Sequence, residues 1–228
     1  MECKRLIPWV LIDTATVPGG GELRLKQRGA EYSIMLGANE LMNNRLSGSE
    51  EALANLSIAR LAHLAEPRVL IGGLGMGFTL RAALGQLGPS AHVTVAELVP
   101  AVVDWARGPM ASVFAGCLDD PRVVVHVGDV GQVMRAKPGI WDAILLDVDN
   151  GPEGLTRESN DALYSLRGLN VARAALRQGG VFSVWSSGTN QNFTQRLHKA
   201  GFQVEETTAR AQNRGGGARH VIWRATKD

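Results

Sequence analysis

The stretch Val69–Arg81, VLIGGLGMGFTLR, decides the fold of this chain. An apolar run passes into a glycine-rich turn, and a helix is expected to leave that turn. A little further on, Val93–Glu97 has the composition of a second strand and ends on a carboxylate. Glycine lets backbone amides approach a ligand where a Cβ would collide, and the start of a helix offers N–H groups without intrahelical partners. The stretch therefore predicts a nucleoside-binding turn, with Glu97 accepting hydrogen bonds from the ribose hydroxyls.

Strand-like and helix-like segments alternate along the rest of the chain after residue 68. Several of these strands are apolar throughout, which is typical of strands buried on both faces of a parallel sheet. The expected strands are Val69–Ile71, His92–Ala96, Val123–Val127, Trp141–Leu146, Val181–Trp185, Phe202–Glu206 and His220–Trp223. A helix is expected over Asn160–Arg177, with Gly179 and Gly180 as its stop signal. We therefore predict an α/β fold with a doubly wound, mostly parallel seven-stranded sheet.

The first 46 residues have a different pattern and predict a small antiparallel β unit. Short extended runs occur at Trp9–Ile12, Glu22–Gln27 and Tyr32–Leu36, and Val17–Gly21 has the composition of a turn between the first two. Ser47–Glu50 then fits a capping box at the start of a helix that runs up to Pro67. We predict two parts, a β unit over residues 1–46 and a nucleoside-binding α/β domain over residues 47–228.

The composition excludes several classes of protein. The 228 residues include 24 basic and 22 acidic side chains, so no basic field favours nucleic acid as a partner. Cys3 and Cys117 are too few for a disulfide framework and have no metal-ligand spacing, so we expect no metal site. No stretch approaches the roughly 20 apolar residues of a membrane span. We therefore expect a cytoplasmic protein. The C-terminal arginines fit either a solvated hairpin or an anionic contact.

Residues that are missing from the glycine turn narrow the choice of nucleoside. A dinucleotide fingerprint requires a third glycine where this chain has Phe78, and a Walker loop requires a Gly-Lys-Ser/Thr that is absent. The remaining common user of such a turn with an acidic strand end is the class I methyltransferase-like Rossmann fold. That fold binds S-adenosylmethionine or its decarboxylated form.

Several stretches in the correct order resemble the spermidine synthase (polyamine aminopropyltransferase) family. VLIGGLGMGFTLR is similar to that family's VLIIGGGDGGTLR, and VAELVPAVVDWAR to its acidic strand end and the following helix. DPRVVVHVGDV, WDAILLDVDNGPEG and LYSLRGLNVARAALRQGGVFSVW resemble later segments of the family, and SEEALANLSI resembles an earlier one. The resemblance covers most of the chain and implies a transferase, assembled as a homodimer.

The resemblance also implies roles for individual residues. The glycine turn would line the methionine-like tail, Glu97 would bind the ribose, Asp129 the adenine amino group, and Asp147 would face the reactive carbon. The expected cofactor-binding residues are Gly73, Gly75, Met76, Gly77, Glu97, Leu98, Gly128, Asp129, Val130 and Asp147. The expected catalytic residues are Asp147, Asp149 and Glu51, which would accept a proton from the acceptor or orient it.

Departures from the family pattern guide the choice of reaction. Met76 stands where the family has the aspartate that holds the free amine of the decarboxylated cofactor, and Ser49 stands where it has a tyrosine. A thioether in place of that carboxylate would leave a buried charge unpaired. We therefore expect a methyltransferase that uses S-adenosylmethionine and acts on a small molecule with an amine or hydroxyl group. A divergent aminopropyltransferase using decarboxylated S-adenosylmethionine and a non-catalytic nucleoside-binding scaffold are the alternatives.

Four of the assigned residues also have a simpler structural interpretation. Asp129 fits an N-cap for the helix that follows it. Glu51 lies in the first turn of a helix, where the dipole favours a carboxylate. Asp147 and Asp149 precede Gly151 and Pro152 and could be turn residues.

Overall fold

The computed structural model describes residues 7–148, 151–152, 162–212 and 217–228. A seven-stranded sheet forms its centre, with strand order β10-β11-β9-β8-β5-β6-β7. The strands are β5 (Arg68–Gly72), β6 (His92–Glu97), β7 (Val123–Val127), β8 (Trp141–Leu146), β9 (Leu176–Ser186), β10 (Phe202–Arg210) and β11 (Arg219–Lys227). Strand β11 runs antiparallel to both of its neighbours, β10 and β9, and the other described strand pairs of this sheet are parallel.

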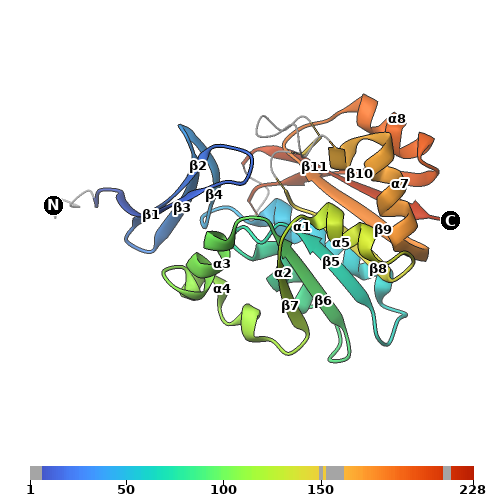
Figure 1. Ribbon diagram of the computed structural model, residues 1–228, viewed down its shortest axis with the longest axis horizontal. Coiled ribbons are helices and arrows are strands. Elements are labelled where there is room, and N and C mark those ends of the chain that lie inside the picture. The colour runs from blue at the N-terminus through green and yellow to red at the C-terminus, as the bar shows by residue number, and fades with distance from the viewer. Residues whose placement is uncertain (1–6, 149–150, 153–161, 213–216) are drawn as a thin grey trace.

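Two hydrophobic cores lie on opposite faces of this sheet because side chains alternate along each strand. On β5, Val69 and Ile71 belong to one core and Leu70 to the other. All six residues of β8 are buried, as the continuous apolar run predicts. The first core packs against α1 (Gly48–Ile58), α2 (Phe78–Leu84), α3 (Pro100–Arg107) and α4 (Ala111–Phe114), and the second against α5 (Val130–Ala136), α7 (Leu166–Ala175) and α8 (Gln191–Lys199). Helices on both faces of a mostly parallel sheet confirm the predicted class I methyltransferase-like fold (Figure 1).

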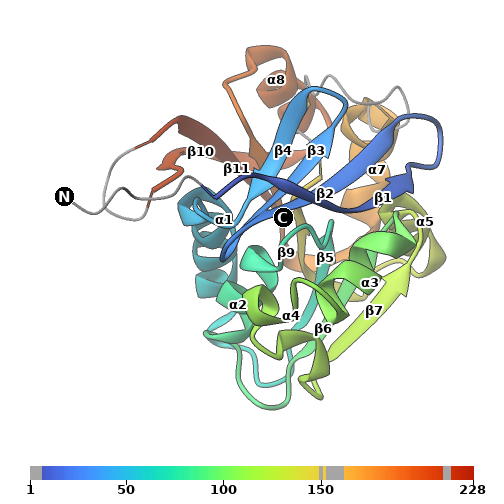
Figure 2. The ribbon, with the colours of Figure 1, turned by 90° about the vertical axis from the view of Figure 1, so that its left-hand side faces the viewer.

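The N-terminal β unit is a separate four-stranded antiparallel sheet in the order β1-β2-β3-β4. Its strands are β1 (Val10–Thr16), β2 (Glu22–Arg28), β3 (Glu31–Leu36) and β4 (Asn39–Asn43), of which the last had no counterpart in the sequence prediction. In Figure 2 this sheet crosses in front of the main domain. Leu25 and Ile34 belong to the first core, and Trp105 Nε1 donates a 2.7 Å hydrogen bond to Asp13 Oδ2, so the small sheet is attached through packing and polar contacts. The predicted boundary at residue 46 falls between β4 and α1, and the division into two domains stays a prediction.

The helix predicted over Asn160–Arg177 is interrupted at Ser165 and ends earlier than expected; residues 162–164 are helical, and residues 160 and 161 lie outside the described residues. Ser165 caps α7 by accepting a hydrogen bond from the Gly168 N–H at 3.1 Å, and the helix ends at Ala175. Leu176 already pairs with Trp141 of β8, so Gly179 and Gly180 lie inside β9 instead of stopping a helix. The boundary between α7 and β9 is therefore decided by the pairing with β8, which the local sequence does not reveal.

The predicted capping box at the start of α1 is also wrong in detail. Ser47 is the N-cap residue, but its side chain accepts no backbone hydrogen bond. Its Oγ donates instead to Glu51 Oε1 at 2.7 Å. The helix ends at Ile58 and continues as a 3-10 turn, η1 (Ala59–Leu61), before reaching Pro67.

Helices of the length and apolarity that a bilayer crossing requires do not occur in the described ranges. Of the C-terminal arginines, Arg224 forms an ion pair with Glu205 at 2.7 Å, whereas Arg214 lies outside the described residues.

Candidate active site

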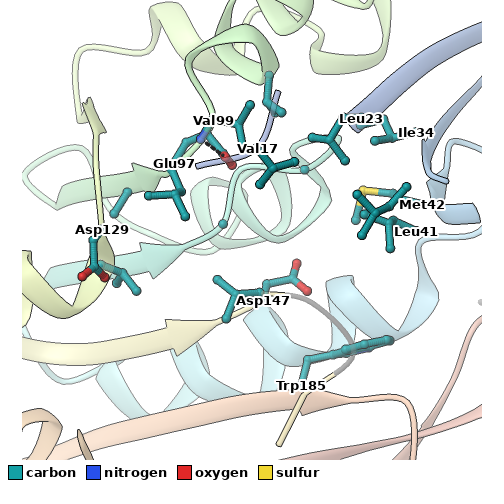
Figure 3. Close-up of a pocket in the computed structure, with 18 of the residues that line it drawn as sticks. Val17, Leu23, Ile34, Leu41, Met42, Glu97, Val99, Asp129, Asp147 and Trp185 are labelled. Atoms are coloured by element: carbon teal, nitrogen blue, oxygen red, sulfur yellow. Dashed lines mark hydrogen bonds between the residues drawn. The ribbon is translucent and has the colours of Figure 1, made fainter. Parts of the chain in front are cut away.

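A cavity of about 190 Å³ lies between the carboxyl ends of the parallel strands and the N-terminal sheet. Strand order reverses between β5 and β8, and ligands of open α/β sheets bind at such a switch point. Figure 3 shows Glu97 and Asp129 on one side of this cavity, Leu41 and Met42 on the other, and Asp147 between them. The N-terminal sheet therefore supplies an apolar wall, and the α/β domain supplies the polar groups.

The glycine turn after β5 is shaped by close contacts with its neighbours. Gly73 has φ +91°, and a Cβ at this position would lie 2.3 Å from the backbone oxygen of Asp147. Gly73 and Gly75 line the cavity, and their contact with a cofactor stays a prediction. Gly77 is not a lining residue, and a Cβ there would meet the ring of Phe114 at 2.6 Å. Two of the glycines therefore form the cavity wall, and the third allows helix α2 to pack against α4.

Glu97 is buried, with 8% of its surface exposed, at the end of β6. Its two carboxylate oxygens accept backbone hydrogen bonds from Leu74 at 2.9 Å and from Val99 at 2.8 Å. Burial raises the pKa of this carboxyl, and the backbone N–H groups of Val99 and Leu74 oppose that rise. Backbone N–H groups of Leu98 and Gly75 also act on this carboxylate, so Glu97 holds the glycine turn in place at the cavity wall.

Asp129 caps helix α5, as its simpler interpretation predicted. Its Oδ1 accepts the Gly131 N–H at 2.7 Å, and Oδ2 lies 3.6 Å from Arg135 Nη2. Gly128, Asp129 and Val130 also line the cavity, as does Leu98 beyond β6. The position is compatible with a contact to adenine, which stays a prediction.

The two roles of Asp129 can be separated by substitution. Asp129→Ala is expected to lower the free energy of unfolding by about 1 kcal/mol because the cap is lost. Asp129→Ser retains a cap but removes the carboxylate, so it should unfold like the wild type and bind 5′-methylthioadenosine more weakly. Chemical denaturation and calorimetric titration measure the two effects. If both variants bind the nucleoside with wild-type affinity, Asp129 caps helix α5 and does not contribute to nucleoside binding.

Asp147 follows β8 and lies beside two groups from other elements. Thr79 Oγ1 of α2 donates to Asp147 Oδ2 at 2.6 Å. Burial, and then the charge of Glu50, raise the pKa of Asp147 to about 7, and the Thr79 hydrogen bond opposes this rise. Burial is also the largest cause of the raised pKa of Glu50. The pair can therefore hold or release a proton near neutral pH.

Besides Gly77, three of the predicted residues lie away from this arrangement or outside the described chain. Met76 is fully buried and does not line the cavity; its backbone N–H points to Met42 Sδ at 3.1 Å. Glu51, which bonds to Ser47, is not a lining residue either. Asp149 lies outside the described residues. The catalytic roles of Glu51 and Asp149 stay predictions.

Sequence reasoning missed several residues that the fold brings into the cavity, among them Glu50 and Trp185. Glu50, one position before the expected Glu51, lines the cavity, and its charge raises the pKa of Asp147. Trp185 at the end of β9 forms part of the same wall. The adjacent pair Glu50 and Glu51 was the available signal, but the helical register that turns one of them inward is set by the packing of α1.

The ionisable groups that line the cavity are all acidic in the described residues. Four of its described lining residues carry a carboxylate, namely Glu50, Glu97, Asp129 and Asp147, and the described lining contains no lysine, arginine or histidine. A low-dielectric wall with charge of one sign favours a ligand of the opposite sign. The fold and the site together define an α/β protein of the class I methyltransferase-like type with a carboxylate-lined cavity at the switch point of its sheet.

Comparison with known proteins narrows this class to a family. Residues 48–210 match the family model described as "Spermine/spermidine synthase domain". The chain belongs to this family.

Individual relatives agree with the family match. A polyamine aminopropyltransferase of Korarchaeum cryptofilum (strain OPF8) is 30% identical over 145 residues, which are 63% of this chain and 42% of that protein. A spermidine synthase of Coffea arabica is 29% identical over 158 residues, 67% of this chain and 47% of that protein. The crystal structure of spermidine synthase from Thermotoga maritima has a TM-score of 0.75 and 19% identity, over 96% of this chain and 73% of that one, which supports the fold. The chain spans less than half the length of these two curated relatives.

These relatives overturn the preference for a methyltransferase. The similar curated proteins carry the names polyamine aminopropyltransferase and spermidine synthase. The preference depended on Met76, whose position in the glycine turn holds no carboxylate. The absence of a carboxylate at Met76 does not leave the cavity without one near Asp147, because Glu50 reaches the cavity from another element.

Proposed function

We propose that this protein transfers an aminopropyl group from decarboxylated S-adenosylmethionine to a small amine. The observation that carries the proposal is the acidic cavity, in which Glu50 and Asp147 lie together without a basic partner among its described lining residues. Both the donor and an amine acceptor are cations, and two nearby carboxylates favour them over neutral ligands.

The residues of the cavity fit such a donor. Glu97 places a carboxylate at the cavity wall that can accept ribose hydroxyls, and Gly73 keeps the wall beside Asp147 free of a side chain. Apolar side chains from the N-terminal sheet, among them Leu41 and Met42, cover the opposite side and exclude water. Glu50 supplies the negative charge that the glycine turn lacks at Met76.

The chemical step requires an aligned nucleophile and a proton acceptor. When bound, decarboxylated S-adenosylmethionine supplies a carbon activated by an adjacent sulfonium. Asp147 binds the acceptor ammonium and takes one proton, so the nitrogen lone pair becomes free. The amine nitrogen then forms a bond to that carbon while the carbon–sulfur bond breaks, and the sulfur retains the bonding electrons as a thioether. A pKa of Asp147 of about 7 suits a group that accepts a proton near neutral pH.

Incubation with decarboxylated S-adenosylmethionine and a panel of diamines and polyamines tests the proposal. We expect 5′-methylthioadenosine and an aminopropylated amine in equal amounts, detected by mass spectrometry. S-adenosylmethionine should give no methylated product with the same panel. If purified protein binds the donor but forms no product with any amine, the proposal is wrong and a nucleoside-binding scaffold explains the fold.

Two further expectations are part of this proposal. A homodimer is supported by apolar residues exposed at the N-terminal sheet, with Val10 at 55% and Leu11 at 52% exposure on strand β1. A cytoplasmic location is supported by the small number of cysteines. Sedimentation analysis tests the first and fractionation of the source cells the second.

A further inference from the structure

Glu50 is connected to the opposite end of the chain by two consecutive hydrogen bonds. Ser49 Oγ donates to Glu50 Oε2 at 2.6 Å. His220 Nδ1, on strand β11, lies 2.8 Å from the same Ser49 Oγ. Ser49 is fully buried, so its hydroxyl has to be satisfied by these neighbours.

The donor and acceptor in each of these two hydrogen bonds can be assigned because the Ser49 hydroxyl has only one proton. If that proton points to Glu50, the Ser49 oxygen must accept from His220, and Nδ1 must carry the ring proton. If Glu50 is protonated and donates, both hydrogen bonds reverse, and Nδ1 of His220 becomes the acceptor. The tautomer of His220 and the charge of Glu50 are therefore linked.

The surroundings of His220 hold its ring in place. Trp185 packs edge-on against it, with ring centroids 4.7 Å apart, and Trp185 itself lines the cavity. Strands β11 and β9 pair through Ile222 and Trp185, so both rings stand on one rigid sheet. At the start of α1, the Gly48 N–H donates to the Ala211 oxygen at 2.9 Å. The two hydrogen bonds from His220 through Ser49 to Glu50 thus connect strand β11 with the start of helix α1.

We propose that His220 is a positioning residue, which acts through Ser49 to hold Glu50 ionised and directed into the cavity and thereby sets the affinity for a cationic amine. Among the described residues, the groups that act on Glu50 are Glu51 on its own helix, Asp147 after β8, and Ser49, which is hydrogen-bonded to His220. Burial lowers the pKa of His220, which keeps the ring neutral at pH 7 and allows a single tautomer to form. The inference rests on the proposed function in that it names how the acceptor is recognised.

The tautomer provides a direct test that does not depend on turnover. Two-bond ¹H–¹⁵N spectra of histidine-labelled protein at pH 7.5 should show His220 protonated at Nδ1 and bare at Nε2. Ser49→Ala removes the acceptor and should abolish this preference. A wild-type ring protonated at Nε2 alone would mean that Ser49 donates to His220 and not to Glu50, which overturns the proposal.

Binding of 1,4-diaminobutane, measured by calorimetry, tests the consequence. His220→Leu should raise the Kd about fivefold, as expected for one lost hydrogen bond, while 5′-methylthioadenosine binds unchanged. His220→Asn, which can still present an N–H to Ser49, should restore the wild-type Kd to within about twofold. His198→Leu, a change at an exposed histidine of α8, is the matched control and should have no effect.

A double-mutant cycle separates positioning from simple loss of structure. If His220 acts only through Ser49, the variant with both Ser49→Ala and His220→Leu should bind the diamine no more weakly than Ser49→Ala alone. Additive losses, or failure of the Asn variant to rescue, would overturn the inference. If the wild type binds the diamine in this pattern but transfers no aminopropyl group, the inference stands and the proposed function is wrong. If the wild type does not bind the diamine, the inference is wrong.

Discussion

Asp147→Asn is expected to lower kcat/KM for aminopropyl transfer by about a thousandfold, the loss typical of removing a general base. The amide oxygen can still accept a hydrogen bond from the Thr79 hydroxyl, so the loop after β8 should keep its shape. It can neither take a proton from the acceptor nor balance its charge. The steady-state assay with decarboxylated S-adenosylmethionine measures this effect.

The same substitution has a pH signature. Because the pKa of Asp147 is about 7, a cationic acceptor should bind the wild type about tenfold more weakly for each pH unit below that value. The folded pKa is raised above the ordinary 3.8, so the folded state binds this proton more tightly than the unfolded state does. The wild type should therefore lose unfolding free energy as the pH rises from about 4 to about 7, and Asp147→Asn should lack that slope.

A matched control is available on an exposed helix surface. Asp104→Asn on α3 removes one negative charge from an exposed position and should change neither the rate nor the pH profile. An Asp147→Asn variant that retains more than a tenth of the wild-type kcat/KM would show that another group accepts the proton.

Glu97→Gln is expected to weaken the binding of 5′-methylthioadenosine about a hundredfold and to lower the free energy of unfolding by about 2 kcal/mol. Both oxygens of Glu97 accept a backbone N–H, from Leu74 and from Val99. A glutamine has only one oxygen, so its amide nitrogen would face one of these donors and leave it unpaired in a buried site. The glycine turn and the ribose contacts should therefore be lost together.

Calorimetric titration with the nucleoside and urea denaturation measure the two effects. Glu66→Gln, at an exposed position between η1 and β5, is the control for loss of a carboxylate. If Glu97→Gln retains nucleoside affinity while its stability falls, Glu97 supports the glycine turn without binding the ribose.

Much of the fold could be predicted because its signals are local. The apolar run of Trp141–Leu146 predicts a buried central strand wherever it stands in the sheet, and β8 has these bounds. The boundary between α7 and β9 was wrong because the pairing of Leu176 with Trp141 involves residues 35 positions apart, which the sequence of either segment does not reveal.

The candidate site divides in the same way. Gly73, Glu97, Asp129 and Asp147 follow strands that the sequence identifies, and parallel strands bring their carboxyl ends to one edge, so these residues could be predicted to meet. Glu50 and Trp185 could not. Glu50 lies near Asp147 because of the rotation of helix α1 about its own axis where it packs on the sheet. The sequence-based prediction of the reaction did not include this carboxylate.

By itself the sequence determined the α/β architecture, the glycine turn and the acidic strand end, because these depend on hydrophobic periodicity and on backbone conformations that few residues adopt. Only the tertiary structure decided which charges share the cavity, because that depends on helix rotation and on contacts between distant segments, such as the line from His220 through Ser49 to Glu50.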